Sequence, residues 1–539
     1  MRKQTKVVAV ASAAALLAIG ASMTSFAATG WTEEDGTWYY YDKDGNRVED
    51  EWRKSGDNWY WLDSEENGAM ATDKLIDDDG DIYYVDANGV MVTNTWVKVV
   101  NEDQDDESDP AEYRYYYMQA TGKAMKGSND STKKKTIDGK KYAFDEDGKM
   151  LYGWVGTDST MMNEEESWKQ ATYYFGGWED GSMKTGWQKI NVFNSNSDAD
   201  DDADKWFYFK SNGEKVFNDD ASEELETKKV NGKTYGFDED GVMVYEWNQA
   251  ASGSSTSASN WGYFNSPEDG ARVTKGWFKV VPHEDFDPTN NNDEEEKWYY
   301  SNGDGTLVTS EIKKINGKYY AFNEKGAMLS GLVALDTTLG VINDIHAVDT
   351  IDSDELDDII NENEDITGYD LYYFGDGDDG AMKTGSTTVN LDGDTYAFNF
   401  ASTGGADTRG QGTTGLVKKV YYKYGKKMAA STDDKYRAAS IDANDAATFV
   451  ASKTLRVGAG DAVRTDSNGN VEKLCKYNNV EAMNLYLIGT NGQLKTKANG
   501  VKDGDDWYFY SDADGKIIFY ANDKDFSKSD EYKAWKAEN

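Results

Sequence analysis

The sequence has little of what usually stabilises a small exported domain or builds a catalytic centre. Its 539 residues include one cysteine, Cys475, and two histidines, His283 and His346. One cysteine excludes an intramolecular disulfide framework, and two histidines in polar stretches cannot form a zinc hydrolase centre with several His ligands. Cys475 has no nearby His to activate a thiol nucleophile. Residues 401–484 lack the regular pattern but are few for a catalytic domain. We therefore predict no enzymatic activity, no cofactor and no metal site.

Basic residues and long hydrophobic runs are also scarce. Lys and Arg number 57 against 99 Asp and Glu, which gives a formal net charge of -42. Such a chain lacks the basic surface that binds nucleic acid, so we predict no nucleic-acid partner. The apolar run at residues 7–19 follows basic residues and is shorter than the ~20 residues that span a bilayer. With small residues ending at Ala27, it predicts a signal peptide over residues 1–27 and no transmembrane segment after cleavage.

Aromatic residues and glycine are abundant and recur in a fixed order. Aromatic residues make up 13% of the chain, and there are 52 glycines but four prolines, all outside the aromatic segments. The segment KINGKYYAFNEKGAM, which begins at Lys314, has near-copies at Lys135 and Lys229 and a degraded copy at Val389. The general unit is Gly-Trp, a turn, an aromatic strand such as WYY, and a polar turn ending in Gly-x-Met. Two short aromatic strands separated by Gly, Asp and Asn predict a β-hairpin, and the recurrence predicts stacked hairpins.

Methionine and tryptophan spacing supports this unit independently. Many of the 15 methionines closely follow the turn glycine of their unit: Met70, Met91, Met125, Met150, Met183, Met243, Met328, Met382 and Met428. Trp96, Trp187 and Trp277 recur at intervals of 91 and 90 residues, with one short INGK unit and one further Trp unit between successive members. Three hairpins therefore form one longer repeat. We predict an all-β fold, a β-solenoid with three hairpins per turn, in which insertions lengthen hairpin tips on two of three faces.

Four acidic stretches interrupt the pattern, namely 102–109, 194–204, 285–296 and 349–365. They show no apolar periodicity, so we predict solvated loops. None has the 12-residue spacing with a central Gly and a terminal Glu that a calcium-binding hand requires, and we therefore predict no specific calcium site.

The GW…WYY…Gly-x-Met unit resembles the choline-binding or cell-wall-binding repeats of Gram-positive surface proteins and autolysins. Its INGKKYAF variant is similar to repeats in streptococcal glucan-binding domains and large clostridial toxins. The resemblance covers about residues 30–400, weakens over 401–484 and recurs near the C-terminus. It implies a left-handed β-solenoid. The predicted organisation is a signal peptide (1–27), a repeat array with acidic insertions (28–400), a divergent or small β region (401–484), and terminal repeats with a tail (485–539).

In the choline-binding members that the chain resembles, the ligand lies between successive hairpins. Two aromatic residues of one hairpin and one of the next form a cage, often with a Met. A quaternary ammonium cannot donate hydrogen bonds, so aromatic faces attract it by cation–π contact. Carried onto this sequence, the resemblance implies cages of Trp31, Trp38 and Tyr40; Trp52, Trp59 and Trp61; Trp187, Trp206 and Tyr208; Trp247, Trp261 and Tyr263; and Trp277, Trp298 and Tyr300. Trp96 and Trp154 are weaker candidates because their second strands open with Tyr.

The same rings are equally suited to a structural core, because stacked hairpins need aromatic contacts to fold. With the resemblance, the sequence predicts a non-catalytic protein attached noncovalently to the surface of a Gram-positive bacterium. Its predicted partner is choline-bearing teichoic acid or another cell-wall polysaccharide. The alternatives are a glucan-binding protein, or a surface-exposed structural protein or adhesin whose acidic loops contact host or neighbouring surface molecules. The identity of the ligand and the number of sites stay open at this stage.

Overall fold

The computed structural model describes residues 29–528, 530, 533 and 537, apart from 105–109, 194–202, 221–223, 347–349, 362–363, 406–407, 453–454, 456–462, 466–470, 477–479 and 481–482. The predicted signal peptide, most of the acidic stretch 194–204 and most of the C-terminal tail lie outside the described residues. Within the described part, no helix combines the length and the apolar character needed to cross a membrane. The chain divides into two compact units, Met1–Val244 and Tyr245–Asn539.

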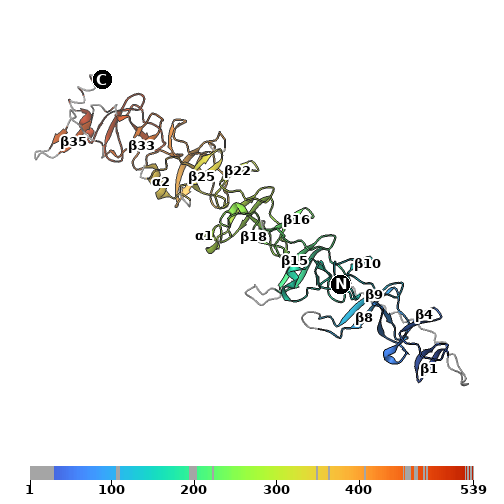
Figure 1. The fold of residues 1–539 in the computed structure, drawn as a ribbon. Helices are drawn as coiled ribbons and strands as arrows, with labels where there is room; N and C mark the ends of the chain where they lie inside the picture. Colours follow the sequence, from blue (N-terminus) through green and yellow to red (C-terminus); the bar gives the residue numbers. More distant parts are fainter. Residues whose placement is uncertain are drawn as a thin grey trace. The chain divides into compact units, whose positions relative to one another are not determined.

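Both units consist mainly of short antiparallel hairpins, so the prediction of a mostly β structure is confirmed (Figure 1). The strands and 3₁₀ helices of the first unit are β1 (Gly30–Glu34), β2 (Thr37–Tyr41), β3 (Glu51–Ser55), β4 (Asn58–Asp63), η1 (Ser64–Glu66), β5 (Ala69–Met70), β6 (Lys74–Asp78), β7 (Asp81–Val85), β8 (Thr95–Val100), β9 (Tyr113–Met118), β10 (Lys135–Ile137), β11 (Lys140–Tyr142), β12 (Trp154–Val155), η2 (Glu165–Gln170), β13 (Tyr173–Tyr174), β14 (Gly186–Val192), β15 (Ala203–Phe209), β16 (Glu226–Val230) and β17 (Lys233–Phe237).

In the second unit, the described residues include the short helices α1 and α2 and several sheets of three to five strands. Its elements are β18 (Glu246–Gln249), η3 (Ala258–Asn260), β19 (Trp261–Phe264), β20 (Gly276–Val280), α1 (Pro288–Asn292), β21 (Lys297–Ser301), β22 (Glu311–Ile315), β23 (Lys318–Phe322), β24 (Leu332–Thr338), β25 (Val341–Ile345), α2 (Ser353–Ile360), β26 (Asp370–Tyr373), β27 (Gly385–Leu391), β28 (Asp394–Phe400), β29 (Gly415–Val417), β30 (Val420–Lys423), β31 (Lys426–Lys427), β32 (Tyr436–Ile441), β33 (Ala447–Phe449), β34 (Val463–Thr465), β35 (Val471–Lys476), β36 (Leu485–Gly489), β37 (Asn499–Lys502), β38 (Tyr508–Ser511), β39 (Ile517–Ala521) and η6 (Lys524–Lys528).

The tightest hairpins follow directly from their turn residues. In the β16–β17 hairpin, Asn231 and Gly232 have φ angles of 49° and 87°. Asn316 and Gly317 take 48° and 88° in the β22–β23 hairpin. Two successive residues with positive φ define the turn whose twist matches that of paired strands, and Asn-Gly adopts it at low cost. The INGK motif is therefore a hairpin turn in both units.

The Gly-x-Met motif joins one hairpin to the hairpin before it. The Met243 N–H donates to the Trp206 carbonyl at 2.9 Å, and the Met328 N–H donates to the Trp298 carbonyl at 2.8 Å. Met150 makes the same 2.8 Å bond to Tyr115. In each case the acceptor lies in the second strand of the preceding hairpin, so a backbone hydrogen bond sets the register of the stack.

The methionine side chain points in the other direction, toward the following unit. A Cβ added to Gly181 would lie 2.2 Å from the Met150 Sδ, and one added to Gly380 would lie 2.2 Å from the Met328 Sδ. Both glycines also have a φ of 56°. The turn glycine is thus required twice, for its left-handed backbone and for the space that the preceding Met occupies.

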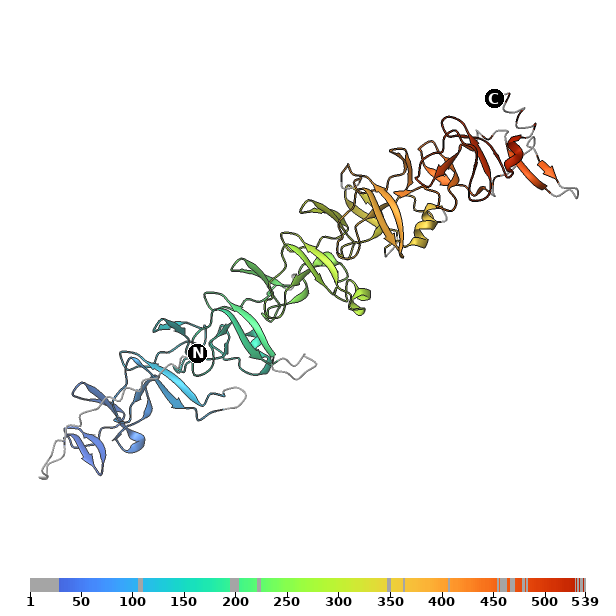
Figure 2. The same ribbon diagram turned by 180° about the vertical axis from the view of Figure 1, so that it is seen from behind.

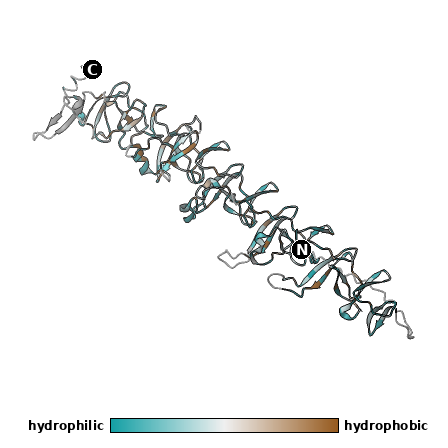
Figure 3. Cartoon of the chain, in the orientation of Figure 1, coloured by the Kyte–Doolittle hydropathy of each residue, from teal (hydrophilic) through white to brown (hydrophobic). Residues whose placement is uncertain are grey.

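The buried hydrophobic residues form several separate clusters, and strongly hydrophobic residues are few along the chain (Figure 3). The prediction of a solvated loop over 349–365 is wrong, because Leu356, Ile359 and Ile360 are buried on one side of α2. They pack in a cluster with Val389 and Phe398 of the β27–β28 hairpin, beside which the helix lies (Figure 2). The spacing of these apolar residues is helical, but the many acidic residues around them hide it in the sequence.

The stretch 285–296 also differs from a solvated loop. Phe286 is 4% exposed and belongs to a hydrophobic cluster, and Asp287 is fully buried. The Asp287 carboxylate pairs with the Lys325 ammonium at 3.0 Å. This insertion therefore packs back onto its own hairpins through an apolar side chain and an ion pair whose carboxylate is buried.

Candidate functional site

Three hairpins that lie about 90 residues apart in the sequence present the same aromatic geometry. In each, the first-strand Trp contacts its cross-strand Tyr and two rings of the next hairpin. The ring-centre distances are 5.2, 4.7 and 5.7 Å from Trp187 to Tyr208, Tyr235 and Phe237; 5.1, 4.8 and 5.6 Å from Trp277 to Tyr300, Tyr320 and Phe322; and 5.3, 4.9 and 5.9 Å from Trp96 to Tyr117, Tyr142 and Phe144. The sequence period therefore corresponds to a repeated packing geometry.

In two of these hairpins a second Trp stands at a right angle to the first. Trp187 and Trp206 have ring centres 6.2 Å apart at 88°, and Trp277 and Trp298 are 6.2 Å apart at 86°. The first Trp of each pair also contacts a Tyr of the next hairpin, and all three rings are half-buried. We call Trp187, Trp206 and Tyr235 corner 1, and Trp277, Trp298 and Tyr320 corner 2. Perpendicular aromatic faces around one point are suited to a compact cation.

Charged side chains border both corners. The Lys189 Nζ lies 5.9 Å from the centre of the Trp206 ring, and the Lys279 Nζ lies 5.9 Å from that of Trp298. At corner 2, the Asp378 carboxylate accepts hydrogen bonds from Lys279 Nζ at 3.0 Å and Trp298 Nε1 at 2.9 Å. These bonds, with that from Lys279 contributing most, lower the pKa of Asp378. Corner 2 therefore combines aromatic faces with a carboxylate that stays ionised, which is a favourable setting for a cation.

The two N-terminal Trp pairs are arranged differently. Trp52 contacts Trp61 at 5.3 Å and Tyr83 of the next hairpin at 5.1 Å, while Trp59 is 41% exposed. Trp61 is buried in the core beneath it. Lys54 lies over Trp59, with its Nζ 5.9 Å from the ring centre, as Lys189 does over Trp206. Each strand of this hairpin contributes one Trp ring. Among the described residues, the rings of Trp52 and Trp59 are not in contact.

The first hairpin follows the same plan. Trp31 contacts Tyr40 at 5.4 Å and Tyr60 of the next hairpin at 5.3 Å. Trp38 is half-buried two residues before Tyr40, and no ring contact between Trp31 and Trp38 occurs among the described residues. The structure therefore places Trp31 in contact with Tyr40 but not with Trp38.

The predicted set of Trp247, Trp261 and Tyr263 lies in a closed interface. Trp247 contacts Tyr263 at 5.2 Å, but Phe286 of the 285–296 insertion fills the adjacent space at 5.1 Å. Trp261 is 5% exposed, and its ring centre is 4.2 Å from that of His283. Phe286 and His283 thus pack against these two rings, where a ligand between the hairpins would have to lie. These rings act mainly as core.

A similar closure occurs at Trp154, where a lysine supplies the cation. Lys215 is 2% exposed, and its Nζ lies 5.5 Å from the Trp154 ring centre and 5.9 Å from that of Trp168. The Nζ donates to the carbonyls of Trp168 at 3.1 Å and Lys169 at 2.8 Å. Burial lowers the pKa of Lys215 to about 8. Lys215 follows the turn glycine Gly213 by two residues, so a tethered ammonium replaces the usual Met.

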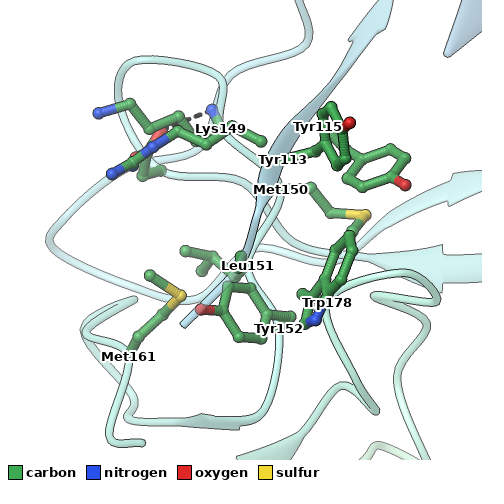
Figure 4. A pocket seen from close by; sticks show the side chains of 11 residues that line it. Tyr113, Tyr115, Lys149, Met150, Leu151, Tyr152, Met161 and Trp178 are labelled. Atoms are coloured by element: carbon green, nitrogen blue, oxygen red, sulfur yellow. Dashed lines mark hydrogen bonds between the residues drawn. The ribbon is translucent and has the colours of Figure 1, made fainter. Parts of the chain in front are cut away.

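Trp178 is a ring that the sequence pattern did not single out. It approaches Tyr113 at 6.3 Å and Tyr115 at 6.4 Å and lines a pocket with Met150 and Tyr152 (Figure 4). Tyr115 occupies the strand position that Trp206 and Trp298 hold in the other two repeats. Trp178, which comes from a later turn, thus lies beside Tyr115, the position at which this repeat has no Trp. The sequence signal is an aromatic residue in a Gly-rich turn, where related turns carry Asp or Asn.

Known repeat families match parts of the chain. The family described as "Choline-binding repeat" matches residues 48–96, and "Putative cell wall binding repeat" matches residues 29–46 and 200–215. The chain thus contains repeats of the choline-binding and cell-wall-binding type, and the resemblance seen in the sequence is confirmed. The matched segments include Trp31 and Trp38, Trp52 and Trp59, and Trp206 of corner 1.

Longer relatives share about a quarter of their aligned residues with the chain. Glucosyltransferase-I of Streptococcus downei is 25% identical over 431 residues, which is 70% of this chain and 23% of that protein. Glucosyltransferase-S of Streptococcus mutans serotype c is 25% identical over 309 residues, or 57% of this chain and 15% of that protein. The chain therefore spans less than a quarter of the length of these relatives. Among solved structures, CbpJ from Streptococcus pneumoniae is 21% identical, with 56% of this chain and 99% of that chain covered and a TM-score of 0.25.

Proposed function

We propose that the chain is a non-catalytic cell-wall-binding protein that holds cationic choline groups of a wall polymer, such as a choline-bearing teichoic acid. The observation that carries the proposal is the repetition of one aromatic corner at Trp187 and Trp277 with nearly identical distances and angles. A fold that needed these rings only as core would not require a second Trp at a right angle with part of its surface exposed. The matched choline-binding repeats support the same ligand class.

Several weak sites suit attachment to a polymer. Each ring contributes on the order of 0.5–2 kcal/mol to binding a cation, so a single corner binds weakly. Sites on one chain that engage neighbouring groups of one polymer gain avidity without new contacts. The proposal assigns corners 1 and 2 as ligand sites. It adds two further sites in which the two Trp rings are not in contact, namely Trp52, Trp59 and Tyr83, and Trp31, Trp38 and Tyr60. It leaves Trp247 and Trp261 out because their interface is filled.

The proposal also includes the finer expectations from the sequence. Residues 1–27 would direct export, after which the mature chain attaches noncovalently at the cell surface. The hairpins would form a left-handed solenoid with three hairpins per turn. The 90-residue recurrence of the corner supports three hairpins per period, since equivalent interfaces return after three hairpins.

A glucose polymer is the second candidate ligand. The two relatives named glucosyltransferases align with much of this chain, and aromatic faces also provide flat apolar surfaces for sugar rings. Asp378 favours the cationic ligand, because a carboxylate bonded to the Trp298 indole adds attraction for an ammonium group.

Calorimetric titration of the leaderless protein with choline, and in parallel with dextran, tests the proposal. We expect saturable choline binding, with one site lost in Trp206→Ala and another in Trp298→Ala. Tyr319→Ala is the matched control. Tyr319 lies at the strand position that Trp298 holds in corner 2, but its hairpin carries Ile312 at the position of Trp277. Absence of saturable choline binding, or equal loss in the Tyr319 variant, would contradict the proposal, and saturable dextran binding alone would establish the alternative.

A further inference from the structure

Three potential metal ligands converge in the second unit, and none of them belongs to an aromatic corner. His346 follows β25, Glu355 lies in the first turn of α2, and Glu364 follows the end of that helix. Their ligand atoms all lie within 4.8 Å of one another. The His346 Nε2 is 2.8 Å from the Glu364 Oε1. One imidazole and two carboxylates thus meet at one point although they are separated by 18 residues of chain.

The surrounding structure holds Glu355 and His346 in place. Asp352 caps α2 by accepting the Glu355 N–H at 2.8 Å, and the Ser353 hydroxyl donates to Asp392 at 2.7 Å. The opposite side of α2 is fixed by its buried leucine and isoleucines. The His346 ring packs 5.2 Å from that of Tyr369, and its backbone N–H donates to the Ala334 carbonyl at 3.0 Å. Such support lowers the cost of ordering the ligands when an ion binds.

The charges at this point are not balanced within the described part of the chain. The side chain of Glu355 is half-buried, and its carboxylate lies within 4.8 Å of the ligand atoms of Glu364 and His346. Asp344 lies nearby, where the Tyr369 hydroxyl donates to its carboxylate at 2.6 Å. Neighbouring carboxylates repel one another when no cation lies between them. A bound divalent cation would remove this repulsion.

We propose that His346, Glu355 and Glu364 bind one divalent transition-metal ion, for which zinc is the best match. Zinc accepts imidazole nitrogen together with carboxylate oxygen, whereas calcium and magnesium select oxygen ligands alone. Three protein ligands leave one position for water. The ion would fasten α2 to the loops on either side of it and so stabilise the insertion between β25 and β26. This site is independent of the proposed choline binding and revises the sequence-based expectation of no metal site.

The test is calorimetric titration of tag-free, leaderless protein with zinc chloride, with calcium and magnesium chlorides in parallel. We expect one zinc site per chain and affinities at least about tenfold weaker for calcium and magnesium. Removing one ligand in Glu355→Gln or His346→Asn should weaken zinc binding by more than about tenfold. His283→Asn is the matched control, because it removes the other histidine of the chain and leaves the three ligands intact.

Thermal unfolding gives a second readout that a purely structural role would not produce. An ion that binds the folded state raises the unfolding temperature in proportion to its affinity and concentration. Zinc should therefore raise the unfolding temperature of the parent and of His283→Asn, but not of Glu355→Gln, whose side chain keeps the shape of glutamate. Zinc binding that is weak, involves many sites and is equal in all variants would overturn the proposal. So would equal binding of calcium.

Discussion

The ammonium group of Lys215 lies 5.5 Å from the ring centre of Trp154, inside an interface between hairpins. Lys215 is the residue at the usual methionine position, and its Nζ is bonded to two backbone carbonyls. The chain thus places its own cation against aromatic rings, in an interface that is closed to solvent. The same physical attraction that we assign to the open corners acts here within the molecule.

Lys215→Met is expected to make stability less dependent on pH. Holding a charged lysine in this interface carries a cost of roughly 3 kcal/mol near neutral pH, given a pKa of about 8 against an ordinary 10.5. That cost is offset in part by its hydrogen bonds to backbone carbonyls, worth about 1–3 kcal/mol. The desolvation cost and the hydrogen-bond gain are of similar size. The free energy of unfolding of the variant should therefore differ from that of the parent by less than about 2 kcal/mol at pH 7.

The pH dependence has a definite sign. Below pH 8, Lys215 is charged in both the folded and the unfolded chain, so the cost is present in full. Between pH 8 and 10.5 the folded state releases the proton first, and the parent should gain stability relative to Lys215→Met. Denaturant titrations at pH 7 and pH 10 measure this change. A difference between the two proteins that stays constant over this range would show that Lys215 is not desolvated.

The contact between Met150 and Gly181 predicts a non-additive pair of substitutions. Gly181→Ala forces a methyl group into the space of the Met150 thioether in addition to straining a left-handed backbone. We expect a loss of about 2–4 kcal/mol, against about 1–2 kcal/mol for Gly232→Ala, where the backbone is left-handed but no atom lies within 4 Å. In the background of Met150→Ala, the cost of Gly181→Ala should fall to that of Gly232→Ala. Urea unfolding of the four variants checks this, and full additivity would disprove the contact.

Asp378→Asn should weaken choline binding at corner 2 while leaving corner 1 unchanged. The carboxylate accepts from Trp298 and Lys279 on an exposed surface, so its removal should barely alter the unfolding temperature. Loss of the negative charge should lower the affinity for a cation and reduce its dependence on salt. Titration at two salt concentrations measures both effects, and corner 1 in the same protein serves as the internal control. An unchanged affinity at both corners would exclude a role for Asp378.

Trp178→Ala tests whether the later turn completes the aromatic set at Tyr115. The variant removes a ring that lies against Tyr113 and Tyr115, so any site there should lose cation affinity. If Trp178 completes a further choline site beside Tyr115, calorimetry of the variant should show one site fewer than the parent, with corners 1 and 2 retained. Should the number of sites stay the same, Trp178 would be a packing residue that covers Met150.

The sequence predicted hairpins well because the rules that govern them are local. Asn316 and Gly317 specify their turn through backbone conformation alone, and the alternation in WYY specifies which rings share a face. The regular spacing of Gly and Met also indicated that the hairpins stack. The sequence does not reveal that the Met150 side chain fills the space next to Gly181.

Which Trp residues would be open to a ligand could not be predicted in the same way. Trp247 and Trp277 have the same local motif, but Phe286 from the 285–296 insertion covers the first and leaves the second at a corner. Such coverage depends on contacts between distant segments, which repeat alignment does not report. The helix α2 was missed for a related reason, since four acidic residues surround its apolar positions.

The fit of each methionine into the next turn glycine bears on how such a chain changes length. At six turn glycines of the described residues the preceding Met side chain occupies the vacant Cβ position, so a joint of this kind does not distinguish one neighbour from another. The aromatic interfaces do, because open and closed ones alternate with a period of about 90 residues. Gain or loss of a complete period of three hairpins would therefore preserve every joint and every interface. Gain or loss of a single hairpin could preserve the Met–Gly joints, but the aromatic rings of one hairpin would then face a hairpin of a different type.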